Sequence, residues 1–227
     1  MRQILRELTI FSRHTIYRLV VAFVVLLLPI FLFVELAEEV KENETIQLDE
    51  AILRAINSFA SSELDTAAVI ITQLGGIIGT SVLTIGIAVL LWGRAKRRMA
   101  TLLVTGVAGA GLLNLLLKAV FQRDRPNLWE RLVTENTHSF PSGHAMASSA
   151  LALSLIVIFW PTRWRWLVIS IAGLFMAVIG FTRLYLGVHY PSDILAGWVV
   201  SAAWVGAMVY ALTYHTTLRK LFRKKRL

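Results

Sequence analysis

The sequence predicts an all-α integral membrane protein that crosses the bilayer six times. Of its 227 residues, 56% are hydrophobic and only 16% are charged, whereas about a quarter of the residues in an ordinary soluble domain carry a charge. The mean hydropathy is +0.66. The apolar residues gather in runs, and a run of about 20 residues is long enough to span a bilayer. Composition and run length therefore indicate a membrane protein before any motif is considered.

Six apolar segments are expected to be the membrane spans. They are residues 19–36, 67–92, 101–121, 145–160, 166–182 and 194–212. The first is too long for the apolar core of a signal peptide, and Glu35 stands where a small residue would precede a cleavage site, so we interpret it as a span. With no internal repeat, the segments favour one membrane domain over residues 1–227.

The linkers alternate in charge, which predicts the orientation in the membrane. Basic residues precede the first span, follow the second and fourth spans, and end the chain, for example at Arg6, Arg97, Arg163 and Lys224. Because cytoplasmic segments are enriched in lysine and arginine, both termini are expected in the cytoplasm. The same clustering explains the net charge of +9 without a nucleic-acid partner.

The first outward linker, about residues 37–65, contains most of the acidic residues of the chain. Its apolar residues recur at helical spacing and form one face: Leu48, Ile52, Leu53, Ile56 and Phe59. The pattern predicts a short amphipathic helix between the first two spans, lying on the outer membrane interface. A soluble cap packed on the bundle explains the same pattern equally well.

Most of the unusual polar residues collect at the outer ends of the last four spans. Charged side chains within a span are costly unless they face a cavity, so such a cluster indicates a functional site. Three cations belong to it, Lys118, Arg125 and Arg183, and few acidic residues stand near them in sequence. Converging cations favour a multiply charged anion, and the planar arginine fork suits phosphate oxygens in particular.

Two prolines, Pro141 and Pro191, mark the expected starts of the fourth and sixth spans, because proline is favoured in the first turn of a helix. These helix N-termini would face the same side of the membrane as the cations, where their free N–H groups bind anions. Gly143 would let the backbone approach such an anion closely. The helix starts and the cations thus indicate the same ligand, a phosphate.

Two histidines suit phosphoryl transfer. His189 and Asp193 are four residues apart and share a helix face, so the aspartate can fix the tautomer and leave the other ring nitrogen free to attack. His144 lies on another span and could protonate the leaving oxygen. A nucleophile, an acid and a cationic cradle need no metal or cofactor. Because the chain has no cysteine, a thiolate nucleophile and thiolate metal sites are excluded.

Each of these features taken alone has a simpler structural explanation. A single His-x-x-x-Asp is common, Lys118 could extend along a span to the interface, and Arg125 could cap a helix. Three further charged residues are interpreted as a solvated loop or as secondary contacts to lipid head groups: Arg123, Asp124 and Arg131. The joint occurrence of the cations and histidines on one membrane face favours the functional interpretation.

At these residues the sequence resembles the type 2 phosphatidic acid phosphatase superfamily, whose motifs are Lys-x6-Arg-Pro, Pro-Ser-Gly-His and Ser-Arg-x5-His-x3-Asp. The corresponding residues are Lys118 with Arg125-Pro126, Pro141-Ser142-Gly143-His144, and Thr182-Arg183 with His189 and Asp193. All spacings are kept, and the one departure is Thr182, which keeps the hydroxyl of the usual serine. The motifs cover residues 118–193, and the layout is similar to the bacterial phosphatidylglycerophosphatase B group, which includes undecaprenyl-diphosphate phosphatases.

The resemblance implies a role for each of these residues. His189 is expected to form a phosphohistidine, Asp193 to orient it, and His144 to protonate the leaving group and then activate water. The expected phosphate-binding residues are Lys118, Arg125, Ser142, Gly143 and Arg183, with Thr182, Pro126 and Pro141 as secondary members. The resemblance also implies that no metal is needed.

The function expected from this resemblance is hydrolysis of the terminal phosphate of a membrane lipid, on the extracytoplasmic face of the cytoplasmic membrane. Phosphatidylglycerophosphate and undecaprenyl diphosphate both present such a phosphate and are alternative substrates. A transporter or scaffold that only binds lipid head groups is the alternative function, but it has no need of the pair His189 and Asp193, nor of His144. A soluble vanadium haloperoxidase shares the motifs, and the six apolar spans argue against it.

Overall fold

The computed structural model describes residue 20 and residues 22–224, with side chains as far as residue 212. Arg6 and the other N-terminal basic residues of the charge argument lie outside the described residues, and the side chains of the basic residues that end the chain are not described. The helices in the described part are η1 (Phe23–Leu27, a π-helical turn), α2 (Leu28–Lys41), α3 (Ile46–Asn57), α4 (Ser62–Gly75), α5 (Ile77–Gly93), α6 (Arg97–Phe121), α7 (Gly143–Phe159), α8 (Arg165–Tyr185) and α9 (Pro191–Lys224).

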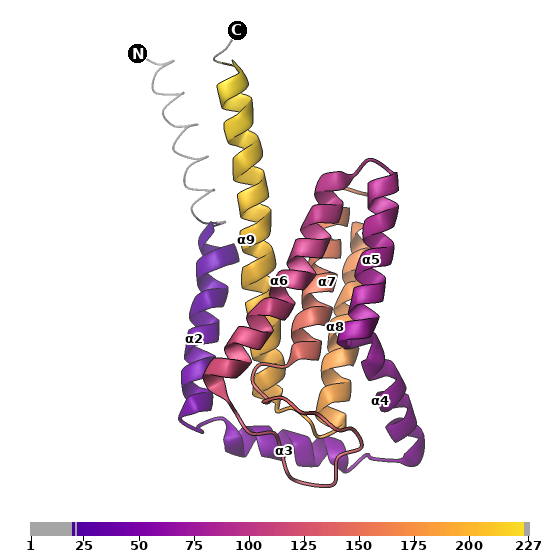
Figure 1. Ribbon diagram of the computed structural model, residues 1–227. Helices are drawn as coiled ribbons and strands as arrows, with labels where there is room; N and C mark the ends of the chain where they lie inside the picture. The colour runs from indigo at the N-terminus through magenta and orange to yellow at the C-terminus, as the bar shows by residue number, and fades with distance from the viewer. Residues whose placement is uncertain (1–19, 21, 225–227) are drawn as a thin grey trace.

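Helix α7 lies at the centre of the bundle, where it packs against α6, α8 and α9 (Figure 1). Its buried residues are mostly small, among them Ala145, Ser149 and Ala152. Small side chains let helix backbones approach closely, which is the usual packing of helices in membranes. Helix α2 packs on the outer side of α9, and α5 on α6.

Several of these helices are long and apolar enough to cross a membrane. In the described part of the chain they are α6, α8 and the Pro191–Leu212 part of α9, and the bent pair α4–α5 counts as a fourth if it forms one span. Helix α7 is apolar but has only 17 residues. The fold is therefore that of a membrane protein with several apolar helices, and the number of six spans stays a prediction.

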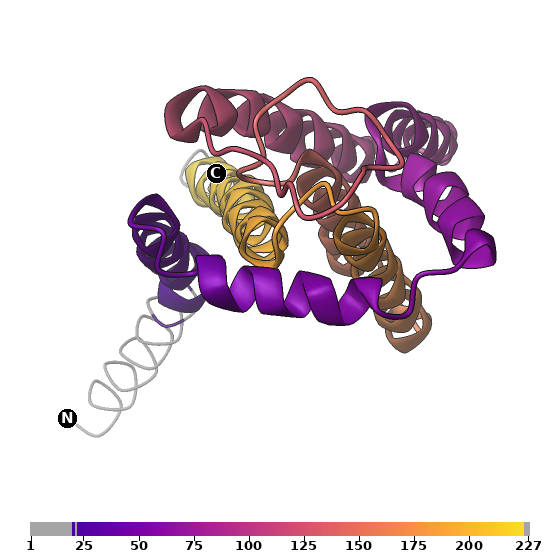
Figure 2. The same ribbon diagram turned by 90° about the horizontal axis from the view of Figure 1, so that it is seen from below.

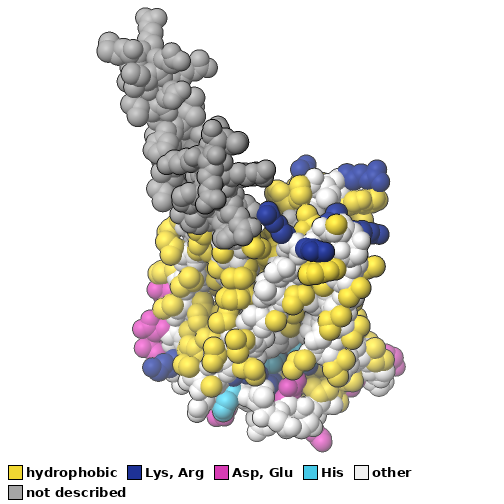
Figure 3. All heavy atoms as spheres, turned by 45° about the horizontal axis from the view of Figure 1, so that its top comes forward, with side chains coloured by type: hydrophobic (Ala, Val, Ile, Leu, Met, Phe, Trp, Pro, Cys, Tyr) yellow, Lys and Arg dark blue, Asp and Glu magenta, His cyan; other side chains and the backbone are white. Residues whose placement is uncertain are grey.

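The surface of the bundle agrees with a membrane environment. Hydrophobic side chains cover the middle of the face seen in Figure 3, while lysine and arginine gather at one end and acidic residues lie toward the other. Among the exposed apolar residues are Ile77, Ile78 and Val120. Such a continuous apolar surface is unusual for a soluble protein and is expected of one that contacts lipid.

The apolar segment predicted as the second span, residues 67–92, lies in two helices that are bent relative to each other. Helix α4 ends at Gly75, α5 begins at Ile77, and the two are bent by 48°. A β-carbon at Gly75 would lie 2.2 Å from Cγ2 of Ile179, and one at Gly76 would lie 3.2 Å from Nε2 of His144. The two glycines thus allow the break to pack against α8 and the start of α7. Hydropathy is continuous across the break and does not reveal it.

Helix α3 lies across one end of the bundle, where it contacts α8 and α9 (Figure 2). A helix was predicted here, but its predicted apolar face is divided. Leu53 is fully buried, whereas Leu48 and Phe59 are 67% and 75% exposed. The buried polar residue is Asp49, because its carboxylate binds the start of α9. The packed side of α3 is therefore a cap on the bundle, and its exposed side can lie at an interface.

The connection between α6 and α7, residues 122–142, lies over the same end of the bundle (Figure 2). Near its end, Phe140 is fully buried and its ring packs against Phe121 and Phe33, with centroids 5.0 and 6.0 Å away. In its middle, Trp129 lies against Gly187, where a β-carbon would be 2.7 Å from the indole nitrogen. Gly187 also has φ +66°, a conformation that favours glycine. The connection is thus fixed to the turn between α8 and α9.

Candidate active site

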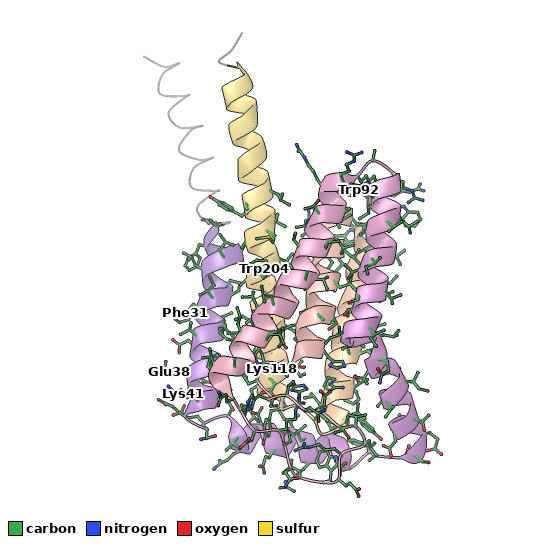
Figure 4. All side chains as sticks on the ribbon, in the orientation of Figure 1. Phe31, Glu38, Lys41, Trp92, Lys118 and Trp204 are labelled. Carbon is green, nitrogen blue, oxygen red and sulfur yellow. The ribbon has the colours of Figure 1, made fainter. Side chains whose placement is uncertain are left out.

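The residues of the three motifs come together at the end of the bundle that α3 and the 122–142 connection cover. Lys118 lies in the last turn of α6, Arg183 in the last turn of α8, His144 in the first turn of α7, and His189 in the turn before α9. Figure 4 shows Lys118 at this end of the bundle and Trp92 toward the opposite end. With Asp193 in the first turn of α9, residues from four helices and two connections therefore form one site.

His189 is buried and both of its ring nitrogens have partners. Nδ1 lies 3.3 Å from Oδ2 of Asp193, and Nε2 lies 3.2 Å from Nη1 of Arg125. A guanidinium can only donate hydrogen bonds, so we assign the proton to Nδ1, which donates it to Asp193. Nε2 then keeps its lone pair and faces the cationic side of the site. This is the nitrogen that can attack phosphorus.

The surroundings of His189 favour its neutral form. Burial lowers the pKa of His189 well below its ordinary value, and the positive charges of Arg125, Arg183 and Lys118 lower it further. A neutral imidazole is the form that acts as a nucleophile, because protonation would remove the lone pair. The site therefore favours the neutral imidazole of His189, which is the nucleophilic form.

Asp193 is held by the first turn of α9. Its Oδ2 accepts a hydrogen bond from the N–H of Tyr190 at 2.9 Å, and Pro191 occupies the first position of the helix. An acidic side chain that reaches back to the residue before a helix is a capping arrangement. The hydroxyl of Ser139 donates to the same oxygen, and Arg123 Nη1 donates to Oδ1 at 2.6 Å. The carboxylate next to His189 is thus fully hydrogen-bonded.

Lys118 and Arg125 are buried and hold the 122–142 connection. Nζ of Lys118 donates to the carbonyl of His138 at 2.6 Å and to Thr137 Oγ1 at 2.9 Å. Arg125 donates from Nη1 to the carbonyl of Val188 and from Nε to the carbonyl of Thr137, both at 2.7 Å. These hydrogen-bond partners are neutral. The carboxylate that pairs with Arg125 is that of Glu135, 3.5 Å from Nη2, so positive charge exceeds negative charge around the two side chains.

Arg183 has one neutral partner, one charged partner and one buried donor without a partner. Nη1 donates to Thr72 Oγ1 at 3.0 Å, and Nη2 forms a salt bridge with Glu135. Nε is buried and has no hydrogen-bond partner among the described residues. A buried donor without a partner is costly, so this N–H is available to an incoming anion.

Glu135 joins two of the three predicted phosphate-binding cations. Its carboxylate pairs with Arg183 and lies 3.5 Å from Nη2 of Arg125. The residue belongs to the 122–142 connection, and its side chain is 23% exposed. A carboxylate thus stands where the sequence predicts a phosphate. Nothing in the sequence marks Glu135, because it lies outside the motifs.

Three further residues predicted to bind or flank the phosphate, Ser142, Thr182 and Gly143, make hydrogen bonds or packing contacts within the protein. The Ser142 hydroxyl caps α7 by accepting from the N–H of Ala145 at 3.4 Å, and its own N–H donates to the carbonyl of Asp193 at 3.1 Å. The Thr182 hydroxyl donates to the carbonyl of Ile179 in its own helix at 2.7 Å. Gly143 allows the close approach of α6, since a β-carbon there would lie 3.0 Å from an oxygen of Asn114.

The two prolines of the motifs accept hydrogen bonds through their carbonyl groups. The carbonyl of Pro126 binds Arg131 Nη2 at 2.6 Å, and that of Pro141 binds the amide of Asn114 at 2.9 Å. Pro141 precedes α7, whose first residue is Gly143. Of the two prolines predicted to start a helix, Pro191 therefore lies in the first turn and Pro141 does not. His144 makes no hydrogen bond to another residue in the described part of the chain, which leaves its ring available for proton transfer.

The prediction that Arg123 lies in a solvated loop was wrong. The side chain is 10% exposed and pairs with both Asp193 and Asp49, because two buried carboxylates need a positive partner. The available signal was its position two residues before the motif arginine Arg125, in a segment without regular secondary structure. Arg131 is half-buried and binds backbone carbonyls of the connection, and Asp124 is exposed as predicted.

Comparisons with known proteins agree on one family. The family model described as the PAP2 superfamily matches residues 99–217, which include all three motifs. Phosphatidylglycerophosphatase B from Bacillus subtilis (strain 168) is 32% identical over 173 residues, which cover 73% of this chain and 83% of that protein. Undecaprenyl-diphosphatase BcrC from the same organism is 31% identical over 158 residues, covering 66% of this chain and 77% of that protein.

The fold is similar to that of a solved structure, the crystal structure of a transmembrane PAP2 type phosphatidylglycerolphosphate phosphatase from Bacillus subtilis. The TM-score is 0.75 at 26% sequence identity, and the match covers 83% of this chain and 96% of that one. Sequence and structure thus point to the same family.

Proposed function

The chain belongs to the PAP2 superfamily, and from this premise we propose that it is a membrane lipid phosphatase acting through a phosphohistidine on His189. The observation that carries the proposal is the arrangement of the two ring nitrogens. Nδ1 lies on Asp193 and Nε2 faces the guanidinium of Arg125. A phosphate bound by the cations would meet the nitrogen that has the free lone pair.

The first step transfers the phosphoryl group to His189. The substrate phosphate replaces the carboxylate of Glu135 on Arg183 and Arg125, and it takes up the free N–H of Arg183. Nε2 attacks phosphorus, and the bond from phosphorus to the leaving oxygen of the lipid breaks. His144, held as imidazolium by the bound anion, gives its proton to that oxygen. Asp193 then faces the positive ring that forms on His189.

The second step releases phosphate and restores the enzyme. His144 is now neutral and takes a proton from a water molecule, whose oxygen attacks the phosphorus of the phosphohistidine. The bond between Nε2 and phosphorus breaks, inorganic phosphate leaves, and His189 is neutral again. The cations stabilise the charge on the transferred group in both steps, which is the main contribution a protein makes to phosphoryl transfer.

The proposed substrate is a lipid with a terminal phosphate, and the names of the relatives suggest two. Phosphatidylglycerophosphate carries a monophosphate and undecaprenyl diphosphate carries a diphosphate, and both offer the same dianionic end to the cations. The apolar surface of the bundle (Figure 3) would leave the lipid tail in the bilayer. The partners of the chain are then the bilayer and this lipid.

The proposed topology has six spans in a single domain over residues 1–227, both termini in the cytoplasm, and the site on the extracytoplasmic face. The support is the charge distribution. The basic segment of residues 94–98, which forms the connection between α5 and α6 and the first two residues of α6, lies at the end of the bundle away from the site (Figure 1). Positive segments favour the cytoplasm. In this topology α2 and α7 complete the set of spans.

The test is phosphate release by the purified protein in detergent with EDTA present. Phosphatidylglycerophosphate and undecaprenyl diphosphate are compared, with His189→Ala as the matched control. We expect release by the wild type and none by the variant, with the ratio of rates ranking the substrates. A folded wild type that releases no phosphate, while lipid binding survives in His189→Ala, would support the alternative of a head-group-binding protein.

A further inference from the structure

Outside the predicted motifs, a buried chain of charges links α3 to Asp193. Arg123 stands between two carboxylates, with Nη1 2.6 Å from Oδ1 of Asp193 and Nη2 2.9 Å from Oδ2 of Asp49. The three side chains are 10%, 0% and 4% exposed. Charges buried this deeply interact strongly, because little water screens them.

Asp49 also binds the start of α9. Its Oδ1 accepts from the N–H of Ser192 at 3.0 Å, and its Oδ2 accepts from the Ser192 hydroxyl at 2.5 Å. The first N–H groups of a helix lack partners within the helix and favour negative groups. Asp49 therefore fixes the same helical turn that carries Asp193.

The guanidinium of Arg123 is fixed from several sides. Besides the two carboxylates, Nη1 donates to Ser192 Oγ at 2.7 Å and Nη2 lies 3.3 Å from Thr45 Oγ1. Its Cζ lies 4.2 Å from the centre of the Tyr190 ring, a cation–π contact. A counter-ion needs only proximity, whereas this arrangement also determines the position of the group.

Resting on the phosphohistidine mechanism proposed above, we propose that Arg123 and Asp49 are positioning residues for the reaction. Asp49 holds Arg123 and the first turn of α9, and Arg123 holds the ionised carboxylate of Asp193 on Nδ1 of His189. Helix α3, which lies outside the three motifs, thereby becomes part of the active site. The effect passes through Asp193 and not through the phosphate.

The physical reason lies in the burial of Asp193. A buried carboxylate that loses its positive partner is strongly destabilised and will turn away or take up a proton. In either case it no longer fixes the tautomer of His189, nor does it stabilise the imidazolium that forms when Nε2 bonds to phosphorus. Binding of the substrate phosphate depends on Lys118, Arg125 and Arg183, which do not contact Asp49.

The first experiment measures kcat and KM for Arg123→Gln and Asp49→Asn with the lipid that the wild type hydrolyses faster. We expect kcat to fall about 100-fold for Arg123→Gln and about tenfold for Asp49→Asn, in the range expected when a reacting group is slightly misplaced. KM should stay near that of the wild type. The matched control is Glu50→Gln, the neighbour of Asp49, whose carboxylate forms an exposed pair with Arg54 and should not affect kcat.

The second experiment distinguishes positioning from a general loss of structure. Arg123→Gln is combined with Asp193→Asn, and because both act through one group, the double variant should be no slower than Asp193→Asn alone. Equal losses from Arg123→Gln in both backgrounds would overturn the proposal. If Arg123→Gln does not fold, the isosteric Asp49→Asn decides, and an unchanged kcat in that variant overturns the proposal too.

The wild type separates this inference from the proposed function. If the wild type releases no phosphate, the phosphatase proposal fails and the positioning role fails with it. If the wild type is active, His189→Ala is inactive and Arg123→Gln keeps the wild-type kcat, then only the positioning role is wrong.

Discussion

Two groups of buried charges lie side by side at the site end of the bundle, and their partners differ. Around Asp193, two carboxylates share Arg123, and hydroxyl and backbone N–H groups complete their hydrogen bonds. The other group, the cationic cradle, consists of Lys118, Arg125 and Arg183. Its one carboxylate partner from the described residues is that of Glu135, and its other partners are neutral. In the first group every charged side chain has its partners within the protein, whereas the second group has an excess of positive charge.

Under the proposed mechanism, the difference separates the part of the site that holds a fixed geometry from the part that exchanges a ligand. A buried network whose members all have partners is rigid, because any movement leaves a charge or a polar group uncompensated. An excess of cations in a low-dielectric site attracts an anion. Glu135 belongs to a surface connection, so it is the partner of the cradle that a substrate phosphate can replace.

The largest effect is expected from breaking the network around Asp193 at its centre. Asp193→Asn keeps the shape of the side chain but removes the charge that orients His189. We expect kcat to fall by about 10³- to 10⁴-fold, as when the aspartate of a Ser-His-Asp triad is replaced, while binding of inorganic phosphate is kept. The measurement is steady-state hydrolysis together with phosphate competition. Asp124→Asn, an exposed change in the 122–142 connection over the site, is the control. Unchanged turnover would mean that another group, such as Ser139, orients the ring.

A smaller effect, a gain in phosphate affinity in place of a loss of activity, is expected from a change at Glu135 in the cationic cradle. Glu135→Gln removes the negative charge that competes with phosphate for Arg183 and Arg125. We expect inorganic phosphate to bind about tenfold more tightly, since breaking a partly exposed salt bridge costs on the order of 1 kcal/mol. Isothermal titration of the purified protein with phosphate measures it. Glu130→Gln, an exposed change in the same connection, should leave the affinity unchanged, and weaker binding to Glu135→Gln would mean that the carboxylate helps to hold the phosphate.

The electrostatic contrast also predicts the pH dependence of the reaction. Because burial and the cradle lower the pKa of His189, the ring stays neutral as the pH falls through about 6.5, the ordinary value. We expect kcat/KM, which reports the free enzyme, to decline only at lower pH, where Nε2 becomes protonated and cannot attack. The profile is corrected for ionisation of the lipid phosphate, titrated without protein. A decline centred at or above the ordinary value would show that the cradle does not act on His189 in this way.

The smallest effect on activity is expected from labelling the two ends of the bundle. Leu128→Cys lies in the connection over the site, and Ala95→Cys lies in the basic connection between α5 and α6. Both variants should keep wild-type activity. On intact cells, an impermeant thiol reagent should label residue 128 and not residue 95, and the natural chain, which has no cysteine, is the blank. The reverse pattern would place the site in the cytoplasm.

The sequence by itself determined the class of the protein and predicted that three cations come together. Apolar runs reveal membrane helices because bilayer thickness sets their length. The pair His189 and Asp193 could be predicted because a spacing of four joins two residues on one helix. Lys118, Arg125 and Arg183 could be predicted to meet because each stands at the outer end of a predicted span. All of these relations are local in the chain or follow from the membrane.

Only the tertiary structure decided how the charges are compensated. Arg123 and Asp49 are 74 residues apart, and Asp49 and Ser192 are 143 residues apart. In the sequence, Asp49 is one acidic residue among several in an outward linker. The break at Gly76 and the placement of Glu135 on Arg183 are equally invisible there. A buried charge accepts a partner from any element that reaches it, so the choice of partner depends on packing and not on spacing.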